Sequence, residues 1–283
     1  MNVESIKTVA IAGAGTMGQG IAQVCALAGF DVALYDVKAD AVKAGIASIE
    51  SSLQKSVDKN KLTADAKKNT LSRIKSCNDL NQLRADLVIE AIVERLEIKR
   101  ELLRAIEKNN SGSILTTNTS SIPVTQIAAG LDERSRFAGL HFFNPAALMK
   151  LVEIVQGTET SSETIETLKS FSFKLGKTSV LVKDSPGFIV NRVARHYYVE
   201  ALKMLEENSA DVKTIDHLLR ASGFKMGAFE LMDLIGLDVN FSVTSSMFNA
   251  FHQDPKFRPS RIQQQKVDAG HLGVKSGKGF YNY

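Results

Sequence analysis

A glycine pattern near the N-terminus constrains the fold more than any other feature of the sequence. The apolar segment Thr8–Ala12 reads as a strand, and Gly13-Ala14-Gly15-Thr16-Met17-Gly18 follows it and opens a helix-like stretch. In such a turn the first glycine permits a tight reversal, the second lets the backbone approach a pyrophosphate, and the third lets helix and strand pack closely. The helix N-terminus adds free N–H groups and a positive dipole end. The pattern predicts a dinucleotide site formed by Gly13, Gly15, Met17 and Gly18.

An acidic residue after the second apolar segment supports this interpretation. The segment Asp31–Tyr35 reads as a strand, and Asp36 follows it, eighteen residues beyond Gly18. That spacing is typical of an acid that hydrogen-bonds a ribose 2′-hydroxyl, and a glycine turn needed only for packing would not explain it. A carboxylate repels a 2′-phosphate, so Asp36 favours NAD over NADP, although Lys38 nearby could tolerate that phosphate. The sequence therefore predicts NAD as the cofactor.

Short apolar, β-branched segments alternate with helix-like stretches through the first part of the chain. The helix-like stretches include Met17–Ala28 and Arg95–Lys108. Such alternation predicts an α/β fold, with a doubly wound, mostly parallel, Rossmann-type sheet covered by helices on both faces. The expected strands are Thr8–Ala12, Asp31–Tyr35, Leu87–Ile92, Ile114–Thr117, Phe137–Phe142, Leu151–Val155 and Ser179–Val182.

One connection between strands is longer than the others. From Ala39 to Ile74 the chain reads as two helices rich in Lys, Ser and Glu, with a turn at Asn60-Lys61-Leu62-Thr63. Thr63 followed by Ala64-Asp65 is typical of a helix N-cap. We therefore expect a helical hairpin that projects from the sheet, and its lysines read most simply as a solvated face.

The pattern changes at Asp184-Ser185-Pro186-Gly187. Beyond this segment the strand pattern stops and helical periodicity begins with Phe188–Glu206. Proline suits the first turn of a helix, where its missing N–H costs nothing. We expect a nucleotide-binding domain over residues 1–185 and a smaller all-helical domain over residues 186–283.

Composition and charge exclude several classes of protein. A hydrophobic fraction of 44% and a charged fraction of 23% are those of a folded globular protein. No apolar run approaches the roughly 18 residues of a membrane span. The two cysteines, Cys25 and Cys77, form neither a disulfide framework nor a metal cluster, and no dense basic stripe suggests nucleic acid. The first strand leaves no room for a targeting peptide, so we expect a cytoplasmic protein.

A histidine and a glutamate on neighbouring strands are the candidate catalytic pair. Oxidation of an alcohol needs a base for the hydroxyl proton, and histidine is the usual choice. Of the five histidines only His141 ends a predicted strand of the sheet, where ligands bind. Glu153 lies twelve residues on, in an apolar strand where a lone carboxylate is costly to bury. Pairing with His141 would fix the imidazole tautomer. A purely structural pair, or a Glu153 that faces water, fits the spacing equally well.

Several ordered motifs resemble the 3-hydroxyacyl-CoA dehydrogenase family, and within it the free-standing bacterial 3-hydroxybutyryl-CoA dehydrogenases. They are Asn118-Thr119-Ser120-Ser121, Gly139-Leu140-His141-Phe142-Phe143-Asn144-Pro145, Asp184-Ser185-Pro186-Gly187-Phe188-Ile189-Val190-Asn191-Arg192 and Gly277-Lys278-Gly279-Phe280-Tyr281. The resemblance covers essentially the whole chain. It implies a reversible, NAD-dependent oxidation of a short (S)-3-hydroxyacyl thioester of coenzyme A.

The resemblance also implies roles for individual residues. His141 would be the general base toward the 3-hydroxyl, and Glu153 would orient and polarise it. Ser120 and Asn191 would hydrogen-bond the reacting oxygen and position the substrate. Further contacts to the cofactor would come from Glu94, Lys99, Asn118, Ser120 and Asn144.

The family further implies that the hairpin contacts the coenzyme A moiety and that the helical domain contacts a second copy of the chain. Ser52 and Lys59 match positions that contact coenzyme A, although this segment varies in length. The apolar residues of the tail would pack a core and also form part of a homodimer interface. They include Phe224, Met226, Phe229, Leu231, Met232, Leu234, Ile235, Leu237, Phe241 and Met247.

Two other functions are compatible with this plan. Dehydrogenases of free hydroxy acids share it, but tend to use a catalytic lysine in the helical domain. A nucleotide-binding relative without chemistry is the second, as a lens crystallin related to the family illustrates. The presence of Ser120, His141, Glu153 and Asn191 argues against that second function.

Overall fold

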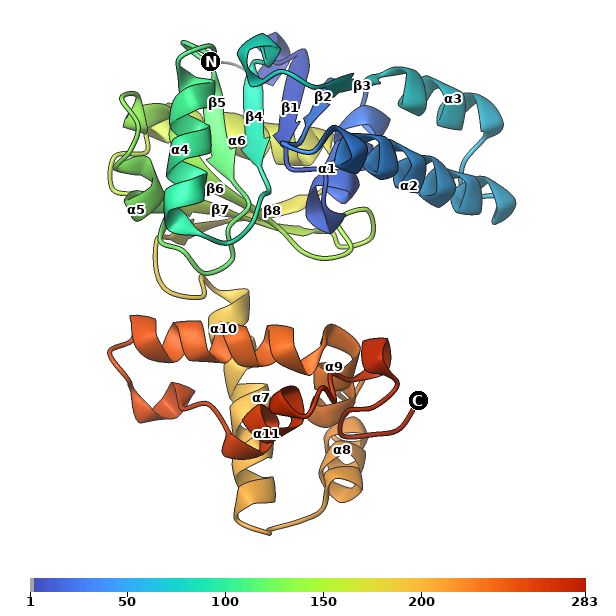
Figure 1. The fold of residues 1–283 in the computed structure, drawn as a ribbon, viewed down its shortest axis with the longest axis vertical. Coiled ribbons are helices and arrows are strands. Elements are labelled where there is room, and N and C mark those ends of the chain that lie inside the picture. The colour runs from blue at the N-terminus through green and yellow to red at the C-terminus, as the bar shows by residue number, and fades with distance from the viewer. Residues whose placement is uncertain (1–2) are drawn as a thin grey trace. The chain divides into compact units, whose positions relative to one another are not determined.

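The computed structural model of the chain describes residues 3–283 and contains two compact units. The first unit runs up to Ser185 and holds the whole sheet, whereas the second spans Pro186–Tyr283 and is built of helices (Figure 1). Within residues 3–283, no helix is both long enough and apolar enough to cross a membrane.

The first unit is organised around one eight-stranded sheet with the strand order β3-β2-β1-β4-β5-β6-β7-β8. Neighbouring strands run parallel, except that β6 and β7 are antiparallel. The order reverses between β1 and β4, which opens a ligand crevice beyond the carboxyl ends of these strands. The expected doubly wound, mostly parallel sheet is confirmed. The strands are β1 Thr8–Ala12, β2 Asp31–Tyr35, β3 Ile74–Cys77, β4 Leu87–Glu90, β5 Ile114–Thr117, β6 Phe137–Phe142, β7 Leu151–Gln156 and β8 Thr178–Lys183.

Helices flank this sheet and share its core. Buried side chains such as Ile11 of β1, Ile89 of β4 and Leu140 of β6 belong to the same apolar cluster as Ile21 of α1. Burial on both faces explains why these strands read as continuous apolar runs. The helices of the unit are α1 Thr16–Leu27, α2 Ala39–Asp58, α3 Ala64–Ser72, α4 Leu96–Glu107, α5 Val124–Ala128 and α6 Ser162–Lys174.

Helices α2 and α3 form the expected hairpin and project together from the sheet (Figure 1). The hydroxyl of Thr63 accepts the N–H of Ala66 at 3.1 Å, which confirms the predicted N-cap. Lys67 connects the two helices, because its Nζ donates to Gln54 Oε1 at 2.9 Å and lies 3.3 Å from Glu50 Oε1. This lysine therefore stabilises the hairpin.

One missed strand and two shifted element ends are the main differences from the expectation. Strand β3, Ile74–Cys77, was missed because its central residues are polar and exposed at the edge of the sheet. Strand β4 ends at Glu90 instead of Ile92, since Glu90 Oε1 accepts the N–H of Ile92 at 2.7 Å and turns the chain. Helix α7 begins at Val190 instead of Phe188, whose φ of +50° is left-handed and incompatible with a helix.

The second unit packs its helices around an apolar core that includes Tyr198, Phe229 and Met232. Asp233 is fully buried and holds the C-terminal segment, because it accepts the N–H groups of Phe280 and Tyr281 at 2.9 Å. The helices are α7 Val190–Glu206, α8 Val212–Ala221, α9 Ala228–Ile235, α10 Leu237–Ala250 and α11 Arg261–Asp268.

Candidate functional site

The glycine turn lies where the strand order reverses, between β1 and β4. Gly13 has a φ of +115°, and a Cβ there would strike the backbone of Ala91. A Cβ at Gly18 would overlap the carbonyl oxygen of Gly13, whereas a Cβ at Gly15 would have no such neighbour within 4 Å among the described residues. Gly13 and Gly18 are therefore required by close packing, whereas Gly15 leaves an open approach to the N-terminus of α1.

A cavity of about 640 Å³ opens beside this turn. It is mainly apolar, with one carboxylate from the residue after β2 and one from α4, and so suits an adenosine-like group with hydroxyls. Its volume and its position beyond strands β1, β2 and β4 fit the dinucleotide predicted from the sequence. The lining residues are Gly15, Thr16, Met17, Tyr35, Asp36, Val37, Ala91, Ile92, Val93, Ile98, Glu101 and Leu102.

Asp36 joins the end of β2 to the glycine turn. Its Oδ2 accepts the N–H of Ala14 at 2.9 Å, and its Oδ1 accepts the N–H of Lys38 at 3.0 Å. A carboxylate has about four lone-pair sites, so both oxygens retain the capacity to accept ribose hydroxyls. The negative charge stands on the cavity wall, where a 2′-phosphate would meet repulsion.

The antiparallel pairing of β6 and β7 brings His141 opposite Glu153. His141 Nδ1 lies 2.8 Å from Glu153 Oε2, and both side chains are buried. The alternative in which Glu153 faces water is therefore wrong. When Nδ1 donates to the carboxylate, the imidazole is held in the tautomer whose lone pair is on Nε2. The ring of Phe143 packs edge-on against this imidazole, with the ring centroids 4.6 Å apart.

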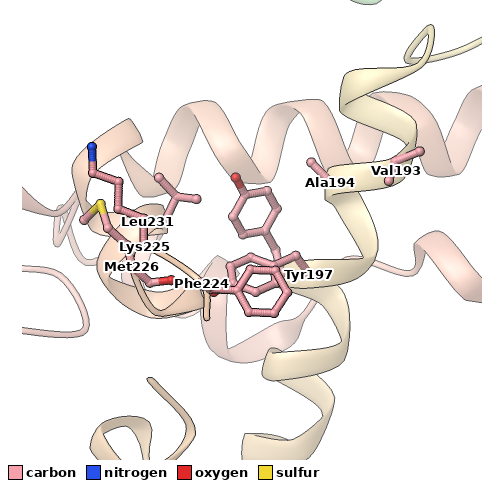
Figure 2. A pocket seen from close by; sticks show the side chains of 8 residues that line it. Val193, Ala194, Tyr197, Phe224, Lys225, Met226 and Leu231 are labelled. Carbon is pink, nitrogen blue, oxygen red and sulfur yellow. Dashed lines mark hydrogen bonds between the residues drawn. The ribbon is translucent and has the colours of Figure 1, made fainter. Parts of the chain in front are cut away.

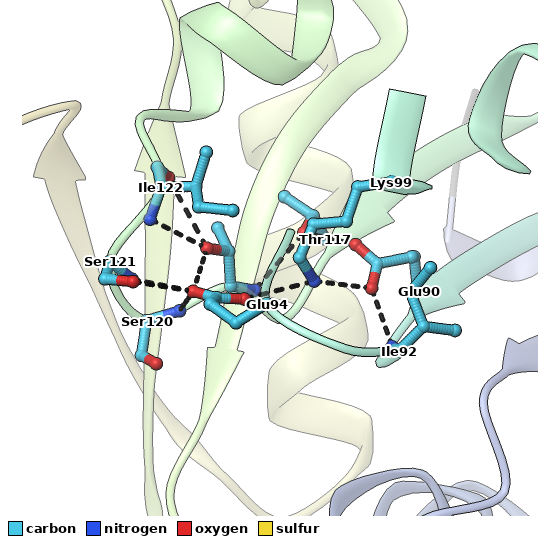
Figure 3. Close-up of polar contacts among 9 residues, drawn as sticks. Glu90, Ile92, Glu94, Lys99, Thr117, Ser120, Ser121 and Ile122 are labelled. Atoms are coloured by element: carbon cyan, nitrogen blue, oxygen red, sulfur yellow. Dashed lines mark hydrogen bonds and ion pairs between the residues drawn. The ribbon is translucent and has the colours of Figure 1, made fainter. Parts of the chain in front are cut away.

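A partly buried network of charges lies at the carboxyl ends of β4 and β5 (Figure 3). Lys99, only 1% exposed, places its Nζ 2.7 Å from Glu90 Oε1 and 3.2 Å from Glu94 Oε2. Glu90 Oε2 also accepts the hydroxyl of Thr117 at 2.6 Å. Glu90 was not among the predicted site residues, although a lone acid closing the apolar run Leu87–Glu90 was a signal for it.

Glu94 extends this network to the loop that carries Ser120. Its Oε1 accepts the hydroxyl of Thr119 at 2.6 Å and the N–H groups of Ser120 and Ser121 at 3.0 Å (Figure 3). Burial raises the pKa of Glu94, but the charge of Lys99 and these hydrogen bonds outweigh burial, so the pKa is lowered. Glu94 therefore stays ionised and fixes the loop.

Asn118 connects the same loop to the strand of the candidate base. Its Oδ1 accepts the N–H of Phe142, the residue after His141, at 2.8 Å. The strands β1, β4, β5 and β6 run parallel. The glycine turn, Glu94, Ser120 and His141 therefore gather at the carboxyl ends of these strands. Asn144 is exposed just beyond β6 at the same edge.

Three predicted site residues lie on helices α2 and α7 or at their ends. Ser52 is on α2 and Lys59 caps its C-terminus, about two helical turns away on the projecting hairpin. Asn191 lies in the first turn of α7, in the second unit. In residues 3–283 we find no group of three or more His, Cys, Asp or Glu side chains that could hold a metal ion.

The second unit carries an apolar cavity, also of about 640 Å³ (Figure 2). The rings of Tyr197 and Phe224 line it with their centroids 4.8 Å apart, and the Tyr197 hydroxyl donates to the carbonyl of Met226 at 2.6 Å. Val193 and Phe224 are 69% and 52% exposed at its rim. Exposed apolar patches of this kind mark interaction surfaces.

Both units match family models. Residues 8–185 match the model of the NAD binding domain of 3-hydroxyacyl-CoA dehydrogenase, and residues 187–283 match the model of the C-terminal domain of the same family. Together these two matches extend over nearly the whole chain.

Individual relatives are similar over almost the full length of the chain. A 3-hydroxyadipyl-CoA dehydrogenase of Escherichia coli is 50% identical over 99% of this chain, which spans only 59% of that protein. A 3-hydroxybutyryl-CoA dehydrogenase of Bradyrhizobium diazoefficiens is 43% identical over 98% of this chain and 96% of its own length. The crystal structure of an (S)-3-hydroxybutyryl-CoA dehydrogenase from Ralstonia eutropha has a TM-score of 0.95 and 41% identity, with 99% of each chain covered.

Proposed function

The chain belongs to the 3-hydroxyacyl-CoA dehydrogenase family, and we propose that it catalyses the reversible, NAD-dependent oxidation of a short (S)-3-hydroxyacyl-CoA to the 3-ketoacyl-CoA. The observation that carries this proposal is the buried pair formed by His141 and Glu153. This pair lies at the end of the sheet where the glycine turn also lies. Such a pair supplies the base that oxidation of an alcohol requires.

In this proposal His141 Nε2 takes the proton of the 3-hydroxyl during oxidation and returns it during reduction. Glu153 holds the imidazole through Nδ1 and stabilises the positive charge that the ring gains. Bound NAD would supply the acceptor for the hydride of C3. The buried position of the pair strengthens the attraction between the carboxylate and the charged ring, because the local dielectric is low.

Ser120 and Asn191 are proposed to hydrogen-bond the reacting oxygen. A hydroxyl and an amide can stabilise a developing negative charge without competing with His141 as bases. Ser120 suits this role because the hydrogen bonds from its loop to Glu94 hold its backbone in place.

The first unit is an NAD-binding domain, and its residues fit that cofactor. The N-terminus of α1 at Gly15 offers unpaired N–H groups for the pyrophosphate, and Asp36 offers acceptors for the ribose. We propose that Met17, Asn118 and Asn144 also contact the cofactor, and that Glu94 and Lys99 contribute through the loop that they fix.

The substrate is proposed to be 3-hydroxybutyryl-CoA, with acetoacetyl-CoA as the product. Two of the relatives described above are named for this four-carbon compound. The relative named for 3-hydroxyadipyl-CoA has the higher identity, so a six-carbon dicarboxylic acyl group is the second candidate. Ser52 and Lys59 on the hairpin are proposed contacts for the coenzyme A moiety, where a lysine can act as a point charge for phosphate.

The helical unit is proposed to form a homodimer through the apolar surface around Val193 and Phe224 (Figure 2). Light scattering at micromolar concentration should give twice the mass of the chain, and a monomer would contradict the proposal. The cytoplasmic location stays a prediction, to be tested by cell fractionation.

Loss of NADH absorbance tests the proposed reaction. Acetoacetyl-CoA, 3-oxoadipyl-CoA and free acetoacetate are offered in turn with NADH. Turnover of a thioester supports the proposal, and the faster of the two thioesters identifies the acyl group. Turnover of the free acid alone would favour a hydroxy-acid dehydrogenase, and no turnover would favour a non-catalytic relative. His217→Gln, at an exposed histidine of α8, is the control for substitutions of His141.

A further inference from the structure

The loop that carries Ser120 is held by two carboxylates, one at its middle and one just beyond its C-terminal end. It comprises residues 118–123, between β5 and α5. On the side of β5, Glu94 Oε1 accepts the N–H groups of Ser120 and Ser121. Together with the bond from the Thr119 hydroxyl, these bonds fix residues 119–121.

The second carboxylate belongs to Asp184, which follows β8. Its Oδ1 accepts the N–H of Val124 at 2.9 Å, and its Oδ2 accepts the N–H of Thr125 at 2.7 Å. These are the first two N–H groups of α5, which otherwise lacks a side-chain cap, because Pro123 precedes it. Asp184 is itself anchored, since its N–H donates to the carbonyl of Gln156 at 3.2 Å.

The fixed loop is tied to the candidate base. The hydrogen bond from the N–H of Phe142 to Asn118 Oδ1 sets the start of the loop relative to the strand of His141. Asp184 sets the end of the loop relative to β7 and β8, and β7 carries Glu153. The position of Ser120 relative to the His141–Glu153 pair therefore depends on Asp184 as well as on Glu94.

We propose that Asp184 is a positioning residue for catalysis, which holds the Ser120 loop at the distance from His141 that the reaction needs. This inference rests on the role proposed above for Ser120. Asp184 acts through the backbone of α5 and does not touch the substrate. A misplacement of about 1 Å can cost a reaction about a hundredfold in rate, so a smaller shift of the loop should cost about tenfold.

The chain offers a matched control in Asp86. Its Oδ2 accepts the N–H groups of Lys7 and Thr8, both at 2.8 Å, so it also holds two consecutive backbone donors. These bonds lie at the amino end of β1, whereas His141 lies near the carboxyl ends of the parallel strands. Asp86→Asn should therefore reduce stability without displacing the Ser120 loop.

The test compares Asp184→Asn and Asp86→Asn in the full chain, with acetoacetyl-CoA and NADH as substrates. We expect Asp184→Asn to lower kcat about tenfold, with the KM for NADH within about twofold of wild type, and Asp86→Asn to leave kcat unchanged. Equal effects of the two substitutions on kcat would overturn the inference. If Asp184→Asn does not fold, Asp184→Glu, which moves the oxygens by one methylene, should show the same drop in kcat.

A double substitution separates this inference from the function on which it rests. If Asp184 acts through Ser120, Ser120→Ala combined with Asp184→Asn should be no slower than Ser120→Ala alone. Losses that multiply would overturn the role of Asp184 and leave that of Ser120 intact. A Ser120→Ala variant with the kcat of wild type would overturn both.

Discussion

Replacing Lys99 with methionine measures how much the buried charges behind the Ser120 loop contribute to stability. The substitution removes an ammonium group that lies 2.7 Å from Glu90 and 3.2 Å from Glu94, and it leaves the fully buried carboxylate of Glu90 with two neutral donors. Removing one partner of a buried ion pair typically costs about 3 to 5 kcal/mol. That is a large part of the roughly 5 to 15 kcal/mol by which a domain is stable.

Urea unfolding followed by circular dichroism gives the measurement. With an m value of about 2 kcal/mol/M, the midpoint of Lys99→Met should fall by about 2 M. Lys174→Met is the control, because Lys174 Nζ also lies 2.7 Å from a carboxylate, that of Glu4, but at the surface. Water already solvates both charges there, so this control should barely move the midpoint.

The comparison tests burial together with the second partner, Glu94, because the shorter Lys99 ion pair has the same length as that of Lys174. A Lys99→Met midpoint that moves no further than that of Lys174→Met would refute the reasoning. It would mean that Glu90 finds other solvation once the ammonium group is removed.

Three further predictions concern the cofactor, the loop and the C-terminal segment. Asp36→Ala should reduce the preference for NADH over NADPH at least about tenfold in kcat/KM, because the charge that repels the 2′-phosphate is lost; an unchanged ratio would contradict this. Because the pKa of Glu94 is lowered, its ionised carboxylate stabilises the fold at pH values above its ordinary pKa of 4.5. This contribution is lost as the pH falls through the lowered pKa. Glu94→Gln should therefore show a weaker fall in melting temperature with decreasing pH than wild type, and equal slopes would argue against it. Asp233→Asn should cost about 1 to 3 kcal/mol in thermal unfolding, since a buried backbone N–H loses its acceptor; exposed Asp268→Asn is the control, and equal melting temperatures for the two variants would contradict the prediction.

The sequence was most informative where one residue type is required by local geometry. Gly13 and Gly18 were predicted from spacing, and the structure shows the backbone contacts that exclude a side chain at both positions. Thr63 was predicted as an N-cap because few residues can accept a helical N–H from that position, and it does so.

The candidate catalytic residues could be suggested from the sequence, but their pairing could not be predicted. Alternation in β7 placed Glu153 in an apolar strand, but the strand register determines which residue of β6 lies opposite. Register depends on the antiparallel turn between β6 and β7 and on packing from both faces, and neither is a property of one segment. The structure was needed to bring His141 and Glu153 within hydrogen-bond distance.

Residues that form hydrogen bonds with distant segments were missed. Asp184 accepts the N–H groups of residues about sixty positions earlier in the chain, and Glu90 joins residues of β5 and α4. In the sequence Asp184 marked a domain boundary and the start of a family motif, and Glu90 lay inside the predicted strand Leu87–Ile92. Edge strand β3 was missed for a related reason, because its pairing with β2 compensates for polar side chains that predict no strand.

The single-turnover rate of NADH oxidation by acetoacetyl-CoA tests most directly whether His141 and Glu153 act as one acid–base unit. His141→Gln should lower this rate by about two to four orders of magnitude while NADH binding is retained. Glu153→Gln should lower it less, and the variant with both changes should be no slower than His141→Gln alone. A loss below about tenfold for His141→Gln, or losses that multiply in the double variant, would contradict the proposed mechanism.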